Sequence, residues 1–313
     1  MIDMNTEAIR FAYGEQLKKL GGIYKNLVVF DADVAHSTRS IDFGGAYPER
    51  YYNVGISEAN MVCMAAGMAS EGFLPVVNTF SFLLCEHCLD QIRSSVAYNR
   101  LNVKFAANYG GLSDSYDGAS HHTITDLSVM RAIPGMSVVV LSDAVQTRAA
   151  LKKILDYTGP VYFRLCRAPT PNFHSGDEGF EIGRAVKLKS GGDITIIASG
   201  IPVYHAQEAA KILENAGIKA GVLEMHTIKP LDEKAVISAA RETGRIITCE
   251  ESNILGGLGG AVAEVLAENC PVKMKRIGIR DVFTPSGDYD GLLGQNGISA
   301  KNIADEAMKL CIN

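Results

Sequence analysis

The chain has 313 residues, of which 47% are hydrophobic and 21% are charged, a composition typical of a soluble globular enzyme with room for two domains. Its 35 acidic and 30 basic residues leave a net charge of −5, so no basic field favours nucleic acid as a partner. No apolar run approaches the roughly 20 residues that span a bilayer, and residues 1–7 lack a basic region followed by an apolar core. We expect a cytoplasmic protein without a membrane partner.

Short β-branched runs alternate with helical periodicity through the first half of the chain, which predicts a mainly parallel sheet covered by helices. The predicted strands are 27–30, 75–79, 103–106 and 137–141, and the predicted helical segments are 57–72, 84–98 and 144–157.

The cysteines do not have the spacing of a disulfide framework, and seven of them in one chain indicate free thiols in a reducing compartment. Cys85 and Cys88 have the C-x-x-C spacing of zinc or redox sites. No second pair completes a four-ligand site, and the two residues begin a helical pattern. We interpret them as buried or half-buried helix thiols, and we predict no metal ligands in this chain.

A segment rich in Pro, Gly and small polar residues follows the first half and predicts a linker at 171–189, between an α/β domain at 1–170 and a second, smaller one at 190–313. The strands predicted for the second domain are 194–198, 220–224 and 245–249, with helices at 203–216 and 232–242.

Four glycines at 256–260 precede a helix predicted to begin near Ala261 and could form a phosphate cradle. The cluster lacks the G-x-G-x-x-G order, the P-loop lysine and the acidic residue about 20 positions on. We therefore interpret it as a turn that lets the helix approach its neighbour.

The most informative segment is 51–61, Tyr-Tyr-Asn-Val-Gly-Ile-Ser-Glu-Ala-Asn-Met, because it places Glu58 in the first turn of an otherwise apolar helix. On its own such a glutamate could simply favour the helix dipole. However, the segment resembles the G-I-x-E element of the transketolase, deoxyxylulose phosphate synthase and 2-oxo acid dehydrogenase families. The resemblance continues through Thr79-Phe80, through Asp90-Gln91-Ile92-Arg93, and through 117–122, which is similar to the D-G-x-[ST]-H loop, and 190–313 resembles the C-terminal domain of these families.

The resemblance implies thiamine diphosphate as cofactor and Glu58 as the catalytic carboxyl group that shares a proton with N1′ of its aminopyrimidine. Burial without a cationic partner would raise the pKa of Glu58 and suit it to this role. Phe80 matches an aromatic residue of the family's pyrimidine pocket. Leu83 and Glu86 stand where Phe and Tyr are common, and Phe82 is positioned to compensate. Asp33 matches an aspartate near the thiazolium side of the cofactor.

Several polar residues match substrate contacts of transketolases. The resemblance implies that Asp117 and His121 read sugar hydroxyls, with His121 also a catalytic candidate. Arg10, Ser37 and Arg167 match groups that hold a terminal phosphate, for which a guanidinium pair is suitable chemistry. Tyr109 replaces a sugar-binding histidine, and Tyr116 replaces a glutamate, so the donor sugar is not predicted.

Members of these families that bind the cofactor without a partner subunit carry a G-D-G motif followed about 25–30 residues later by Asn. This motif holds Mg²⁺ and the diphosphate. Gly287-Asp288-Tyr289 does not complete this motif. We therefore expect the metal and the diphosphate to be held mainly by an N-terminal partner subunit, which associates with a homodimer of this chain in an α2β2 assembly.

The leading hypothesis is the C-terminal subunit of a split transketolase, which moves a two-carbon ketol unit from a ketose to a phosphorylated aldose. Two alternatives remain. A 2-oxo acid dehydrogenase β subunit shares the glutamate but is less consistent with the 117–122 loop. A non-catalytic homologue would have no physical need for Glu58, Asp117 and His121 in a dry pocket.

Overall fold

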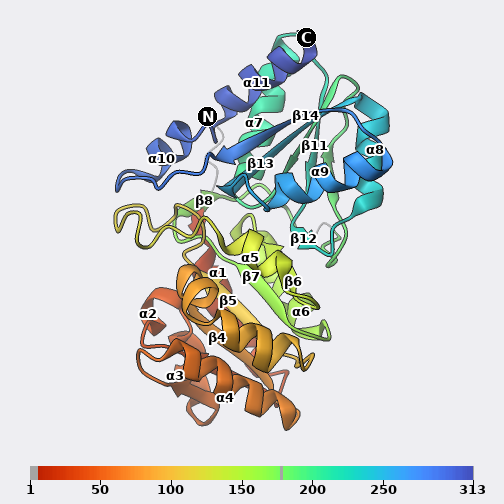
Figure 1. Ribbon diagram of the computed structural model, residues 1–313. Coiled ribbons are helices and arrows are strands. Elements are labelled where there is room, and N and C mark those ends of the chain that lie inside the picture. The colour runs from red at the N-terminus through yellow and green to blue at the C-terminus, as the bar shows by residue number, and fades with distance from the viewer. Residues whose placement is uncertain (1–5, 177–178, 313) are drawn as a thin grey trace.

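Two α/β domains follow one another along the chain in the computed structural model, which describes residues 6–176 and 179–312 (Figure 1). The described part leaves out residues 177–178 of the predicted linker. It also leaves out residues 1–5 of the N-terminal segment, where the sequence predicts no targeting signal. Each domain has a mainly parallel sheet covered by helices, which confirms the predicted fold class. None of the helices in the described ranges is long and apolar enough to cross a membrane.

The first sheet has seven strands in the order β12-β6-β7-β5-β4-β2-β3. All neighbours in it are parallel except the pair β12 and β6. The strands are β2 (Leu27–Asp31), β3 (Tyr51–Asn53), β4 (Leu74–Phe80), β5 (Lys104–Asn108), β6 (Ser137–Val140), β7 (Val161–Arg164) and β12 (Thr227–Lys229).

Helices cover both faces of this sheet. One face carries α1 (Ile9–Gly21), α3 (Ile41–Ala46) and α6 (Ala144–Asp156), and the other carries α4 (Glu58–Ser70), α5 (Asp126–Ala132) and η3 (Gln91–Ala97). Shorter turns, α2 (Ala35–Thr38), η1 (Pro48–Arg50) and η2 (Leu83–His87), lie between strands.

The segment predicted as one helix at 84–98 is helical but differs in its winding. It consists of the wide π-type turns η2 and η3, which are interrupted at Cys88, where the backbone has φ −113° and ψ 8°. Cys85 and Cys88 are both buried free thiols, which confirms their interpretation as packed side chains.

The second sheet has five strands in the order β14-β13-β10-β11-β9, with only β9 antiparallel. Its strands are β9 (Val186–Lys189), β10 (Ile194–Ala198), β11 (Ala220–Glu224), β13 (Arg245–Asn253) and β14 (Lys273–Ile279). Its helices are α7 (Pro202–Asn215), α8 (Glu233–Thr243), α9 (Leu258–Asn269), α10 (Tyr289–Gln295) and α11 (Ala300–Ile312).

The second half of the chain contributes one strand to the first sheet. Strand β12 follows β11 in the chain but pairs with β6 of the first sheet. A small separate sheet joins β1 (Thr6–Ala8) to β8 (Pro169–Pro171). The second half is therefore not fully separate, because one of its strands completes the edge of the first sheet.

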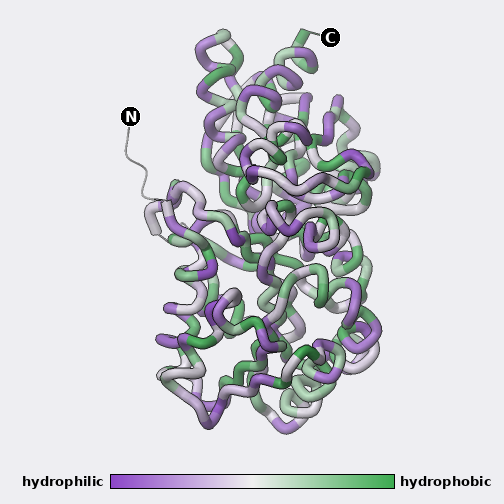
Figure 2. The backbone as a smooth tube through the Cα atoms, turned by 90° about the vertical axis from the view of Figure 1, so that its left-hand side faces the viewer, coloured by the Kyte–Doolittle hydropathy of each residue, from purple (hydrophilic) through white to green (hydrophobic). Residues whose placement is uncertain are grey.

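Apolar residues on both faces of the central strands explain the layers. In β2, Leu27 and Val29 pack into one buried cluster, whereas Val28 and Phe30 pack into the other. This is the pattern of a parallel strand covered by helices on both sides. Figure 2 shows hydrophobic segments passing through the interior of both domains.

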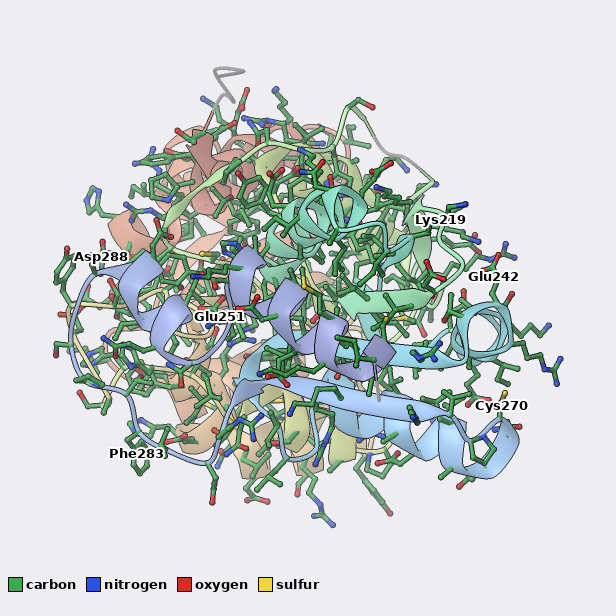
Figure 3. The ribbon with its side chains drawn as sticks, turned by 90° about the horizontal axis from the view of Figure 1, so that it is seen from above. Lys219, Glu242, Glu251, Cys270, Phe283 and Asp288 are labelled. Atoms are coloured by element: carbon green, nitrogen blue, oxygen red, sulfur yellow. The ribbon has the colours of Figure 1, made fainter. Side chains whose placement is uncertain are left out.

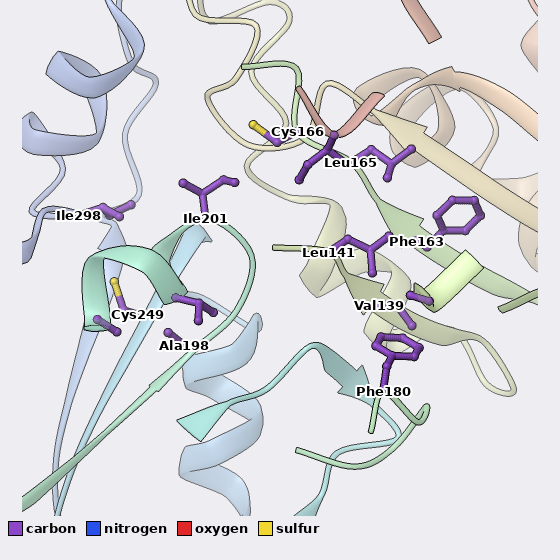
Figure 4. Packing of buried hydrophobic residues seen from close by; sticks show 14 of the residues in the cluster. Val139, Leu141, Phe163, Leu165, Cys166, Phe180, Ala198, Ile201, Cys249 and Ile298 are labelled. Atoms are coloured by element: carbon purple, nitrogen blue, oxygen red, sulfur yellow. The ribbon is translucent and has the colours of Figure 1, made fainter. Parts of the chain in front are cut away.

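Each buried cluster contains residues from both domains. Figure 4 shows Leu141 and Phe163 of the first domain in the same cluster as Ala198 and Ile201 of the second. A continuous apolar core of this kind fixes the position of the second domain against the carboxyl ends of β6 and β7.

Candidate active site at the carboxyl edge of the first sheet

The predicted site residues follow the carboxyl ends of neighbouring parallel strands. Residues Asp31 and Asn53 pair across β2 and β3, and Phe80 pairs with Asn108 across β4 and β5. Asp33, Glu58, Phe80, Tyr109 and Arg167 lie at or just beyond these ends. Ligands of open parallel sheets bind at this edge, where loops converge.

Glu58 is the first residue of α4. Gly55, with φ +74°, allows the turn that reverses the chain between β3 and this helix. Glu58 is 7% exposed as a whole residue, and among the described residues no side chain or amide donates a hydrogen bond to its carboxylate. Burial, followed by the charge of Glu58, raises the pKa of the nearby Cys88 thiol to about 12. The Glu58 oxygens are not among the fully buried unpaired atoms of the described residues, so the carboxylate is accessible at this edge and open to a hydrogen bond from a ligand.

A row of rings lies beside the end of β4. The rings of Phe80 and Tyr109 are nearly parallel with centroids 4.5 Å apart, and Phe82 is 6.4 Å from Phe80. His121 meets Phe82 edge-on at 5.0 Å. Phe80, Phe82 and Leu83 are half-buried, so part of each side chain remains accessible. This row offers flat apolar surface for an aromatic ligand.

Tyr109 adopts φ +60°, a left-handed conformation that costs a non-glycine residue roughly 1–2 kcal/mol. Its hydroxyl accepts a hydrogen bond from Nη1 of Arg10 at 3.0 Å. The guanidinium groups of Arg10 and Arg167 lie 5.9 and 5.0 Å from the centroid of its ring. Nη1 of Arg10 also donates to the carbonyl of Ser37 at 3.2 Å, so four residues predicted to bind an anion or a sugar are in contact.

Arg167 is not free in this arrangement. It forms ion pairs with Asp114 and with Asp117, the latter at 3.5 Å. Burial raises the pKa of Asp114 to about 7, and its hydrogen bond to Asp117 adds to the increase. The same hydrogen bond lowers the pKa of Asp117, so Asp114 is the member of the pair that takes up a proton first.

His121 lies in the loop that carries Asp117. Its Nδ1 is 3.0 Å from the hydroxyl of Ser120, and its ring is half-buried against Phe82. The loop thus connects the ring row to the Arg167 cluster.

Asp33 and Glu58 lie on the same edge, and among the described residues no hydrogen bond or ion pair joins either of them to the ring row, whereas Leu83 directly follows Phe82. Asp33 is exposed, with φ +64°, and its Oδ1 accepts a hydrogen bond from Nδ2 of Asn53 at 3.1 Å.

Two functional candidates are not evident from the sequence. Asp114 lies three residues before the recognised Asp-Gly pair, and no local motif singles it out. Asp31 is buried and accepts hydrogen bonds from the Val34 amide at 2.7 Å and from the hydroxyls of Thr38 at 2.8 Å and Ser40 at 2.7 Å. It therefore shapes the loop that presents Asp33 and Ser37. The sequence does contain one sign of this role for Asp31, because an aspartate that ends a buried strand and is followed by hydroxyl residues often accepts hydrogen bonds from the next loop.

The glycine cluster at 256–260 is a close-packed turn. Helix α9 begins at Leu258, three residues earlier than predicted, because the Glu250 carboxylate accepts hydrogen bonds from the amides of Leu258 at 2.7 Å and Gly259 at 2.8 Å. A Cβ atom at Gly257 would come within 2.0 Å of that carboxylate. An internal carboxylate therefore occupies the helix N-terminus that a phosphate would need.

Within residues 6–176 and 179–312, no group of three or more His, Cys, Asp or Glu side chains is arranged to hold a metal ion. The chemistry available at the carboxyl edge is that of one buried carboxylate, a row of rings, two guanidinium groups and a sugar-sized set of polar side chains.

Comparison with known proteins identifies the family of both domains. The family model "Transketolase, pyrimidine binding domain" matches residues 6–172, and "Transketolase, C-terminal domain" matches residues 183–303. The chain is 41% identical over 299 residues to a 6-deoxy-6-sulfo-D-fructose transketolase chain of Clostridium sp. (strain MSTE9), covering 96% of this chain and 93% of that one. It is 38% identical over 306 residues to one chain of the apulose-4-phosphate transketolase of Phocaeicola vulgatus, covering 97% and 98%.

Among solved structures, one described as "Split gene transketolase, inactive beta4 tetramer" is similar with a TM-score of 0.90 and 43% identity. The match covers 97% of this chain and 98% of that chain.

Proposed function

Because the chain belongs to the transketolase family and consists of its pyrimidine-binding and C-terminal domains, we propose that it is the C-terminal subunit of a split, thiamine diphosphate-dependent transketolase. In this proposal it transfers a two-carbon ketol unit from a ketose to a phosphorylated aldose, and it is active only with an N-terminal partner subunit.

The observation that carries the proposal is the environment of Glu58. The residue is mostly buried, with 7% of its surface exposed, and its carboxylate lies at the carboxyl edge of the sheet with no hydrogen-bonding partner among the described residues. A ligand nitrogen that shares a proton with it would complete the hydrogen bonding that the protein leaves open.

The residues on this edge fit thiamine diphosphate in part. Phe80, Phe82 and Leu83 present half-buried apolar surface of the kind that an aminopyrimidine ring needs, and Glu58 would share a proton with N1′ of that ring. Asp33 would face the thiazolium side. When bound, the cofactor supplies the carbon nucleophile that attacks the ketose carbonyl.

The groups around Tyr109 fit an anionic acceptor. Arg10 and Arg167 flank one ring, and Ser37 contacts Arg10 through its carbonyl, so a phosphate that displaces a carboxylate from Arg167 would meet two guanidinium groups. The two relatives compared above are named for sugars that carry a sulfo or a phosphate group, which supports an anion-binding role for this cluster. Asp117, His121 and Tyr109 would bind sugar hydroxyls, and His121 would exchange protons with them.

No described residue set accounts for a magnesium ion, so Mg²⁺ and the diphosphate are assigned to the partner subunit. The cofactor then lies between chains, and a homodimer of this chain binds two partners as α2β2. A related β chain is described as an inactive tetramer, which supports both self-association and dependence on a partner.

Calorimetric titration of thiamine diphosphate with Mg²⁺ tests the shared site. We expect tight, stoichiometric binding only when this chain and its N-terminal partner are combined. Tight binding to this chain alone would show that the metal and diphosphate are held here and would contradict the split site.

Turnover tests the reaction. The reconstituted complex should convert a ketose donor with a phosphorylated aldose acceptor and should be inactive with 2-oxo acids. Turnover of 2-oxo acids would instead support a dehydrogenase β subunit. Tight cofactor binding without turnover of any donor would support a non-catalytic homologue.

A further inference from the structure

The second domain holds the loop at 109–123, which carries Tyr109, Asp117 and His121. At the start of this loop, Oε1 of Glu251 accepts a hydrogen bond from the Leu112 amide at 2.6 Å. The Glu251 side chain packs directly on Gly111, where a Cβ atom would come within 2.4 Å of it. Gly111 also has φ +66°, so only glycine fits this position easily.

Glu251 is itself held in place. The hydroxyl of Tyr289 donates a hydrogen bond to Oε2 of Glu251 at 2.9 Å. Nη2 of the buried Arg164 donates both to the Glu251 carbonyl at 2.9 Å and to the Thr123 carbonyl at 2.7 Å. One oxygen of the Glu251 carboxylate therefore binds the loop, and the other binds the first residue of α10. Figure 3 shows Glu251 inside the molecule, whereas Asp288, just before α10, lies near its outer edge.

The far end of the loop has its own attachments to the second domain. The Ile124 carbonyl accepts hydrogen bonds from the Ser252 hydroxyl at 2.9 Å and from the Asn253 amide at 2.8 Å. Nδ1 of His122, next to His121, lies 2.6 Å from the hydroxyl of Thr284.

The middle of the loop is also tied. The Gly287 amide donates to the Ser115 carbonyl at 3.0 Å, two residues before Asp117. In Figure 1 the loop runs beneath the segment that leads into α10. Every stretch that bears a predicted sugar contact is thus bonded to the second domain within a few residues.

An irregular loop of this length has little ordering of its own, since it contains one isolated bridge, Gly111 to Thr123, and a few turns. Loops of this kind open readily unless tertiary contacts hold them. Misplacing substrate-binding groups by about 1 Å can cost on the order of 10²-fold in rate.

We propose that the second domain is a positioning element of the sugar site: Glu251, braced by Tyr289, and Thr284 hold the 109–123 loop so that Asp117 and His121 meet the substrate. The expected effect of these contacts on sugar binding rests on the proposed transketolase function. Their restraint of the loop does not depend on that function.

The test uses Tyr289→Phe and Thr284→Val, which each remove one hydroxyl while preserving most of the side-chain volume. Tyr204→Phe in α7 is the matched control, because it removes the same hydroxyl elsewhere in the second domain. Amide hydrogen exchange in the full chain should become about tenfold faster at Leu112 in Tyr289→Phe and at residues near His122 in Thr284→Val, and should be unchanged in the control.

Kinetics of the complex with the N-terminal partner supply the second readout. KM for the sugars should rise about tenfold in both variants, as expected for one lost hydrogen bond, while calorimetric affinity for thiamine diphosphate stays as in the wild type. Unchanged loop exchange would overturn the proposal, as would an equal loss of cofactor and sugar affinity. If the wild-type complex itself turns over no sugar, the proposed function fails, and hydrogen exchange alone decides whether the second domain holds the loop.

Discussion

The guanidinium group of Arg167 can pair either with protein carboxylates or with the anionic group of an acceptor. The competition between them affects how tightly the site binds a phosphorylated acceptor. It now pairs with the carboxylates of Asp114 and Asp117, which match the guanidinium in the same way as a phosphate does. An anionic acceptor must therefore displace at least one carboxylate. Since burial raises the pKa of Asp114 to about 7, this competition should weaken as the pH falls below 7.

Replacing Arg167 with alanine should raise KM for a phosphorylated acceptor by about ten- to a hundredfold, because one charge-assisted contact is lost. KM for an unphosphorylated acceptor should change far less, and Arg10→Ala should act in the same direction. Asp114→Asn is the opposite control: by removing the competing charge it should lower KM for the phosphorylated acceptor at pH 8 more than at pH 6. Equal effects of Arg167→Ala on both acceptors would remove this residue from the anion site.

Glu58→Gln should lower ketol transfer by at least about 10²-fold while leaving the circular dichroism spectrum and assembly with the partner unchanged, because the amide cannot share a proton with the cofactor. The substitution keeps the size and shape of the side chain at the start of α4, so a folding defect is not expected. Activity within about threefold of the wild type corresponds to less than 1 kcal/mol of barrier and would contradict the catalytic role.

At the scale of elements, the start of α9 shows how a loop and a helix depend on one buried carboxylate. Glu250, within β13, accepts from two of the four helix amides that have no partner within the helix. Gly257 provides the space, since any side chain there would meet the carboxylate. The helix can therefore begin within the glycine cluster.

Glu250→Ala should lower the free energy of unfolding by roughly 1–3 kcal/mol, since two buried amides lose their acceptor. Urea unfolding measures it. Glu250→Gln keeps one acceptor oxygen and should cost less. Glu268→Ala, on the exposed side of the same helix, should stay within about 0.5 kcal/mol of the wild type. If all three variants were equally stable, the carboxylate would not be needed to start the helix.

At the scale of the whole molecule, a buried ionic cluster joins the two domains. His174, from the connecting segment, lies with Nδ1 3.0 Å from Asp143 at the start of α6 and with Nε2 2.8 Å from Glu224 at the end of β11. Burial alone would lower the pKa of His174, but hydrogen bonds to both carboxylates raise it to about 10. The neighbouring His226 is held neutral, because burial lowers its pKa to about 4.

The pKa shifts of His174 and of the two carboxylates determine how the stability contributed by the cluster depends on pH. His174 has its raised pKa only in the folded state, so its contribution is complete below about pH 6.5 and is lost as the pH rises toward 10. Hydrogen bonds to His174 lower the pKa of both Asp143 and Glu224 despite their burial, so their contribution is lost in acid. Stabilisation by the cluster should therefore be greatest at about pH 5–6.5.

His174→Ala should lower the free energy of unfolding by roughly 3–5 kcal/mol at pH 6, because it leaves two buried carboxylates without their cation. The difference from the wild type should shrink steadily between pH 7 and pH 10, as measured by urea unfolding. His205→Ala serves as a control at a histidine outside this cluster. A difference that does not vary with pH would show that His174 acts by packing alone.

Local sequence patterns were sufficient for the two-domain α/β architecture and for the position of Glu58. The unbroken apolar run Leu27–Phe30 in β2 buries Val28 and Val29 on opposite faces, and it requires helices on both sides. Gly55 and the apolar helix after Glu58 likewise lie within one short segment. Such features depend on near neighbours, so they can be inferred without knowing the rest of the fold.

Tertiary structure alone decided how the halves of the chain meet at the site. The pairing of β12 with β6 and the hydrogen bond from the Leu112 amide to Glu251 join residues about 90 and 139 positions apart. Asp114 became a candidate only when folding brought it to Arg167, and His174 only when it met Glu224. Buried polar groups choose partners by three-dimensional distance, and no local pattern in hydrophobicity or turn residues records that choice.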